Sequence, residues 1–153
     1  MAQLAIVAFA LAALAAGGSA GAYSFSPAPT RFSATGVLNL ASKQAGSKCE
    51  ITLRGKVNGK GVGEIDAFTF KGNSQCHGTV ATGLPWQVFA AGPTSGKIVG
   101  FGFSGSFFGD CEAGSMPFTD DGSGDWTLSG TLPPGCTVNG FLNTTPAIVI
   151  VSP

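Results

Sequence analysis

Four cysteines, and the repeat in which they stand, constrain the fold of this chain more than any other feature of its sequence. Cys49, Cys76, Cys111 and Cys136 are separated by 27, 35 and 25 residues. The two outer intervals both open with Cys-Glu, and each closing cysteine is followed by a valine, a leucine and a proline in that order. We interpret the chain as two degenerate copies of about 55 residues, over roughly residues 32–92 and 97–153.

An even number of cysteines in an exported chain indicates a disulfide framework. Three pairings are possible, and the repeat favours Cys49–Cys76 together with Cys111–Cys136. A zinc site or a cysteine nucleophile is not expected. The sequence has no CxxC motif, and its one histidine, His77, is replaced by Thr137 in the second copy. The cysteines therefore predict two structural disulfides, one in each copy.

Residues 1–22 have the composition of a secretory signal. They carry no charged side chain, are mostly apolar, and end in Ala20-Gly21-Ala22, a small-residue cleavage pattern before Tyr23. A secretory signal usually has Lys or Arg near its start, and this segment has neither, so the alternative is a retained hydrophobic tail. Such a tail is the one route to a membrane that we expect. We predict an extracellular, cell-surface protein with a single domain over residues 23–153.

Charge is scarce and unevenly divided along the chain. Charged residues make up 10% of the sequence and sum to zero, yet residues 23–97 carry +5 and residues 98–153 carry −5. A chain with so little charge is expected to lie against a hydrophobic surface or another copy of itself. The uneven division favours packing between the halves or head-to-tail association of copies. Binding to nucleic acid is not expected, because the chain is neutral and has no cluster of arginines.

Alternation of apolar and polar residues predicts β-strands throughout residues 23–153. Turn signals such as Asn58-Gly59 and Asp121-Gly122 separate the predicted strands. The sets expected to share one face of a strand are Cys49, Ile51 and Leu53; Asp66, Phe68 and Phe70; and Val99, Phe101 and Phe103. The pattern predicts an all-β fold, an antiparallel sandwich or barrel, in which each disulfide closes a hairpin.

Aromatic and β-branched residues supply the candidate contact surface. AIVIVSP, residues 147–153, is either a buried final strand or a strand that pairs with a neighbouring molecule. The candidate interface residues are Tyr23, Phe25, Phe32, Trp86, Phe107, Phe108, Ile148 and Ile150.

The sequence contains no recognisable catalytic or metal-binding motif. TDDGSGDW, residues 119–126, lacks the downstream glutamate of a calcium loop and is interpreted as a hairpin tip. We identify no catalytic residue, metal ligand or cofactor site, and we expect a protein that is not an enzyme.

CHGTVATGLPW, residues 76–86, carries a resemblance to a known family. Together with GCTVNG at residues 135–140 and Pro146, it resembles the bacterial alkane-oxidation activators (PraB-like) over most of the chain after residue 22. The resemblance implies a secreted, non-enzymatic protein that helps cells use hydrophobic carbon, by emulsifying it or by modifying the cell surface. The alternative is a self-assembling extracellular filament or biofilm matrix subunit, joined by strand addition and head-to-tail charge contacts.

Overall fold

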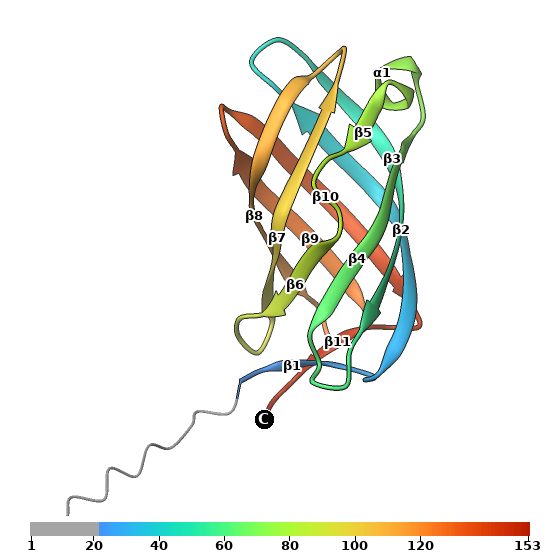
Figure 1. The fold of residues 1–153 in the computed structure, drawn as a ribbon, viewed down its shortest axis with the longest axis vertical. Coiled ribbons are helices and arrows are strands. Elements are labelled where there is room, and N and C mark those ends of the chain that lie inside the picture. Colours follow the sequence, from blue (N-terminus) through green and yellow to red (C-terminus); the bar gives the residue numbers. More distant parts are fainter. Residues whose placement is uncertain (1–21) are drawn as a thin grey trace, which may run out of the picture.

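The computed structural model describes residues 22–153, which form a closed antiparallel β-barrel (Figure 1). The predicted all-β fold is confirmed, and it is a barrel rather than a sandwich. The predicted signal segment lies outside the described residues, apart from Ala22. The elements are β1 (Ser24–Ser26), β2 (Thr30–Ala41), β3 (Gly46–Val57), β4 (Gly63–Lys71), α1 (Ser74–His77), β5 (Thr79–Ala81), β6 (Trp86–Ala90), β7 (Ser95–Gly105), β8 (Gly109–Asp120), β9 (Asp125–Leu132), β10 (Cys136–Thr145) and β11 (Val149–Val151).

Strands that follow one another in the chain lie side by side in the barrel. The order is β2, β3, β4, β5 with β6, β7, β8, β9 and β10, and β10 pairs with β2 to close the sheet. β5 and β6 share one position, because each pairs with β4 on one side and with β7 on the other. A closed sheet has no open edge strand.

Alternate residues of each strand fill the interior. Trp126 packs against Phe25, Phe32 and Phe118, with ring centroids 4.5 to 6.0 Å away. A second aromatic cluster includes Trp86, which contacts Phe68 and Phe101. Phe70, Phe103 and Phe108 extend this cluster through ring contacts with one another and with Phe68 and Phe101. Burying one such side chain contributes about 2 to 3 kcal/mol, so these rings form the main stabilising element of the barrel.

Two register shifts make part of the predicted alternation wrong. Val99 faces outward and is 39% exposed, whereas Phe101 and Phe103 are buried, because the β7–β8 register shifts at Gly100, which has φ +86°. Asp66 is likewise exposed while Phe68 and Phe70 are buried, because the β3–β4 register shifts next to Arg54. The shared inward face of Cys49, Ile51 and Leu53 is confirmed.

Strands β1 and β11 pair with each other across one end of the barrel (Figure 1). Phe25 and Ile148 lie inside this closure and are 1% and 0% exposed. Trp126 Nε1 donates to the Ile148 carbonyl oxygen at 3.1 Å, and the Ile150 backbone N–H donates to Asp120 Oδ2 at 2.7 Å. Both chain ends of the described domain are therefore fixed to the barrel by polar contacts as well as by apolar packing.

The predicted disulfides Cys49–Cys76 and Cys111–Cys136 are both present, with Cα–Cα distances of 5.6 and 5.8 Å. Each joins the open end of a hairpin, β3–β4 or β8–β9, as the sequence predicts. Each also spans a place where strand pairing is short. β4 pairs with β5 only through Thr69 and with β6 through three residue pairs, and β8 pairs with β9 through three residue pairs.

Candidate contact surfaces

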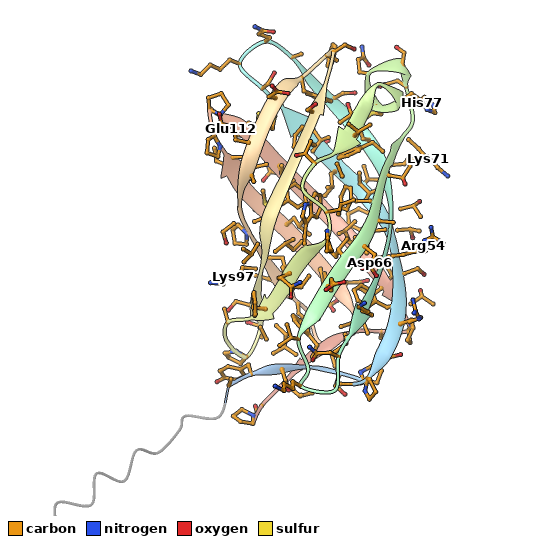
Figure 2. The ribbon with its side chains drawn as sticks, viewed as in Figure 1. Arg54, Asp66, Lys71, His77, Lys97 and Glu112 are labelled. Atoms are coloured by element: carbon orange, nitrogen blue, oxygen red, sulfur yellow. A yellow bond between two sulfur atoms is a disulfide. The ribbon has the colours of Figure 1, made fainter. Side chains whose placement is uncertain are left out.

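Apart from Lys97 on β7 and Lys43 and Lys60 in loops, the charged side chains lie on two sides of the barrel, and Figure 2 labels members of both groups. One side, here called the charged wall, is the outward face of β2, β3 and β4, with Arg31, Lys48, Glu50, Arg54, Lys56, Glu64, Asp66 and Lys71. The other, here called the acidic hairpin, is β8–β9 with its turn, and carries Asp110, Glu112, Asp121 and Asp125 on its surface, the buried Asp120, and no Lys or Arg. Because β3 and β4 are four strand positions from β8 and β9, these two surfaces lie on opposite sides.

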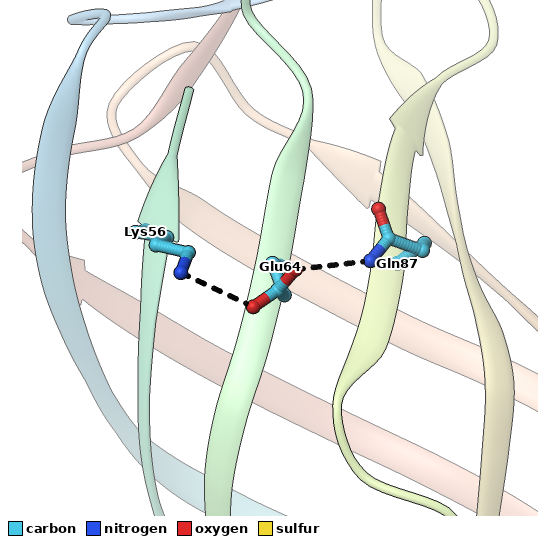
Figure 3. A network of polar contacts seen from close by, with 3 residues as sticks. All are labelled: Lys56, Glu64 and Gln87. Atoms are coloured by element: carbon cyan, nitrogen blue, oxygen red, sulfur yellow. Dashed lines mark hydrogen bonds and ion pairs between the residues drawn. The ribbon is translucent and has the colours of Figure 1, made fainter.

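A short polar network crosses the charged wall (Figure 3). Glu64 Oε1 lies 3.4 Å from Lys56 Nζ, and Gln87 Nε2 donates to Glu64 Oε2 at 3.2 Å. A hydrogen bond shared with Asp66 lowers the pKa of Glu64 and raises the pKa of Asp66. Such exposed pairs add little stability. They link side chains of three neighbouring strands, β3, β4 and β6, on the outer surface.

An apolar stripe, defined as Val80, Phe89 and Val99, runs along the side formed by β5, β6 and β7. These side chains are 59%, 37% and 39% exposed. Phe89 is paired with Lys97 and Gln87 with Val99, so Phe89 and Val99 are diagonal neighbours on the outer face. Phe89 and Val80 each follow a buried residue, so strand alternation alone could have placed them outside the core.

The CHGTVATGLPW segment builds the part of the barrel that presents this stripe. Cys76 is in a disulfide and His77 is exposed at the last residue of α1, so the two do not form a reactive pair. Thr79 Oγ1 donates to the Gln75 carbonyl oxygen at 2.8 Å. Trp86 Nε1 donates to the carbonyl oxygen of residue 82 at 2.8 Å, which ties down the loop between β5 and β6. The CHGTVATGLPW segment therefore has a structural role in the barrel.

Most of the candidate interface residues turn out to be core residues. Phe25, Phe32, Trp86, Phe108 and Ile148 are buried, which corrects the expectation that they form a contact surface. Their side chains point inward or close the barrel end, where they contact other rings of the same chain. Tyr23, Phe107 and Ile150 are partly exposed. The terminal strand β11 pairs with β1 of the same molecule.

The TDDGSGDW segment forms the β8–β9 turn. Asp121 Oδ1 accepts hydrogen bonds from the Ser123 hydroxyl at 2.7 Å and from the Ser123 and Asp125 backbone N–H groups at 2.8 and 3.2 Å. These bonds lower the pKa of Asp121. Within residues 22–153, no group of three His, Cys, Asp or Glu side chains is placed to hold a metal ion. The same residues include no helix of the length and apolarity needed to cross a membrane.

The architecture is that of a small antiparallel β-barrel braced by two disulfides, with a filled interior and charges segregated on its outer surface. The family model described as alkane oxidation protein activator PraA/PraB-like matches residues 1–152. The chain therefore belongs to this family, as the resemblance indicated, and the family description of an activator favours a non-enzymatic role. Neither the curated proteins nor the solved structures contain a match to the chain.

Proposed function

We propose that this chain is an exported, non-enzymatic protein that adsorbs to hydrophobic carbon phases and so aids their use by the cell. The observation that carries the proposal is the apolar stripe, which consists of the exposed Val80, Phe89 and Val99. Lys97 is the charged residue paired with Phe89 across the strands. Moving exposed apolar surface from water to an oil phase is favourable in proportion to its area. Family membership supports the connection with alkanes.

Two further features support the exported location and the adsorbed state. Residues 1–22 have the composition of a signal segment, and paired disulfides persist in oxidising compartments outside the cytosol. The sheet is closed and braced by two disulfides, so the barrel can place Phe89, Val80 and Val99 at a phase boundary while its core stays buried. The barrel then adsorbs as a folded object.

The proposal predicts that Phe89→Ser/Val99→Ser slows the fall of hexadecane–water tension in a pendant-drop assay. Each substitution removes about 0.5 to 1 kcal/mol of transfer free energy, so we expect adsorption to weaken about two- to fivefold per residue. The matched control is Phe141→Ser/Val37→Ser, which changes one Phe and one Val on β10 and β2, on the opposite side of the barrel. Equal effects of both double variants would contradict the proposal.

A second candidate function is a self-assembling extracellular subunit. The observation that favours it is that the acidic hairpin and the charged wall lie on opposite sides of the barrel. The charged wall, counted together with the loops at the two ends of β3, has a net positive charge. Contacts between two different, opposite faces repeat from copy to copy and generate an open row. The barrel sheet is closed, so a strand of a neighbouring copy could add only to the two-stranded β1–β11 sheet, and this candidate rests on charge.

Self-assembly of this kind predicts rows or filaments in negative-stain images at low ionic strength and dispersed particles at high ionic strength. At 0.1 M salt, interactions between exposed charges more than about 10 Å apart are largely screened, and the screening length shortens as salt is added. Asp110→Asn/Glu112→Gln removes two exposed acids of the hairpin and should abolish the rows at low salt, whereas Lys97→Gln, outside both surfaces, should not. Dispersed wild-type particles at every ionic strength would exclude this candidate.

A further inference from the structure

The middle part of the outward face of β9, β10 and β2, here called the neutral wall, differs from the rest of the barrel in its chemistry. Its members are Thr127, Ser129, Thr131, Thr137, Asn139, Phe141, Asn143, Thr35, Val37 and Asn39. Every polar member is a hydroxyl or an amide, and none is charged. Two charged residues of the same strands, Arg31 and Asp125, border this wall near the starts of β2 and β9. Protein surfaces in water ordinarily mix charges of both signs, so an uncharged stretch across three adjacent strands indicates a surface that meets a neutral partner.

Phe141 is the centre of the neutral wall and is 53% exposed. In strand register it lies opposite Val37 of β2 and Thr127 of β9. A hollow of about 490 Å³ lies beside the ring, lined by Phe141, Asn143 and Val37 on the side of the neutral wall and by Glu50 of β3 and Lys71 of β4 on the other side. An exposed ring next to a hollow, on the middle strand of an otherwise hydrophilic wall, presents a flat stacking surface to a ligand.

Two asparagines flank the ring on the same strand and are held by neighbours on β9. Ser129 Oγ donates to Asn139 Oδ1 at 2.9 Å, which directs the Asn139 amide hydrogens away from Ser129. Asn143 Nδ2 donates to Asp125 Oδ1, which directs the Asn143 carbonyl oxygen away from Asp125. Each asparagine is two residues from Phe141, or about 7 Å along the strand. The ring thus has a fixed donor on one side and a fixed acceptor on the other.

From this arrangement we infer that the neutral wall binds a neutral polysaccharide, with one sugar ring stacked on Phe141 and neighbouring sugars bonded to Asn139 and Asn143. The C–H face of a pyranose ring is apolar, and its edge carries hydroxyl groups that both donate and accept hydrogen bonds. Side chains already fixed by Ser129 and Asp125 lose little conformational freedom on binding. This inference does not rest on the proposed adsorption to oil.

The same chemistry disfavours other occupants. A second copy or another protein is expected to bury an apolar core, and on this wall only Phe141 and Val37 are apolar. An anionic polymer would require free Lys or Arg to pair with its charges. Lys71 at the hollow is already the cross-strand neighbour of Glu50, and the Asp125 carboxylate contacts Asn143. An oil phase would strip water from hydroxyl and amide groups without replacing their hydrogen bonds. A neutral polysaccharide can stack a sugar ring on Phe141 and form hydrogen bonds with the amides of Asn139 and Asn143.

The test is co-sedimentation of the oxidised protein with microcrystalline cellulose, cross-linked galactomannan beads and starch granules, at low and high salt. We expect at least one polymer to bind the wild type, with an affinity that is independent of salt. Phe141→Ser should weaken that binding about five- to tenfold, as expected for loss of one stacking contact, and Phe141→Tyr should retain it. Asn139→Ala/Asn143→Ala should weaken it while leaving the ring in place.

Phe89→Ser, on the opposite side of the barrel, is the matched control and should bind like the wild type. Near-ultraviolet circular dichroism of the buried Trp86 and Trp126 checks that every variant is folded. Failure of all three polymers to bind, or equal binding by wild type and Phe141→Ser, would overturn the inference. So would binding that disappears at high salt, because it would then belong to the charged wall.

Discussion

Replacing Cys111 and Cys136 by serine is expected to lower the free energy of unfolding by about 3.5 kcal/mol, the loop-closure value for a separation of 25 residues. Beyond this overall loss, the effect should be local. The bond links β8 to β10 across β9, and β8 pairs with β9 through only three residue pairs. Urea unfolding under oxidising conditions measures the first effect, and amide hydrogen exchange along β8 and β9 measures the second.

The other disulfide provides the control for this local effect. Cys49→Ser/Cys76→Ser should cost a similar free energy, because its separation of 27 residues is nearly the same. Its increase in hydrogen exchange should appear instead between β4 and β5, which share the single pair Thr69–Val80. Identical exchange patterns in the two double variants would show that the bonds stabilise the whole barrel rather than these two short pairings.

Gly36→Ala is expected to destabilise the barrel by about 3 kcal/mol, the upper part of the range for overpacked cores. A Cβ atom at Gly36 would lie far inside the van der Waals distance of the Phe141 carbonyl oxygen on β10. That oxygen belongs to a paired backbone and cannot rotate away. Since β2 and β10 close the barrel, relief would require separating the two strands. Thermal unfolding should show a decrease in melting temperature of about 10 °C.

Gly46→Ala is the matched control for this prediction. Gly46 is paired with Ala41 on the other side of β2, and its added Cβ would lie at an ordinary 3.6 Å from the Ala41 Cβ atom. The substitution should leave stability unchanged or raise it by up to about 1 kcal/mol, because alanine restricts the unfolded chain. A loss in Gly46→Ala as large as that in Gly36→Ala would contradict the explanation by close strand approach.

Strand type, turn positions and disulfide pairing were all predictable from the sequence. Cys49, Ile51 and Leu53 alternate as a buried strand face should, and Asn58-Gly59 and Asp121-Gly122 do lie in turns. These features depend on neighbouring residues or on the repeat, which are visible in a single sequence. The family resemblance, drawn from structural residues such as Trp86, is likewise confirmed by the match to residues 1–152.

Closure and the outer surfaces were not predictable in the same way. Barrel closure depends on β10 meeting β2, a contact between distant parts of the chain that periodicity does not contain. Register shifts at Gly100 and beside Arg54 reverse the faces of Val99 and Asp66, because one extra residue inverts every position after it. The exposure of Phe141 was predictable, since it alternates with buried Leu142. The uncharged surface around it was not, because its residues come from three separate strands.

Strands β1 and β11 lie at one end of the barrel axis, whereas the apolar stripe and the neutral wall run along opposite sides (Figure 1). A molecule resting on oil by its stripe would lie on its side, with the axis in the plane of the surface and the neutral wall turned to the water. An adsorbed film would then be one barrel width thick, and a label attached at Pro153 would lie beside the β1–β11 end of each barrel. Neutron reflectivity of such a film would measure that thickness and the depth of the label.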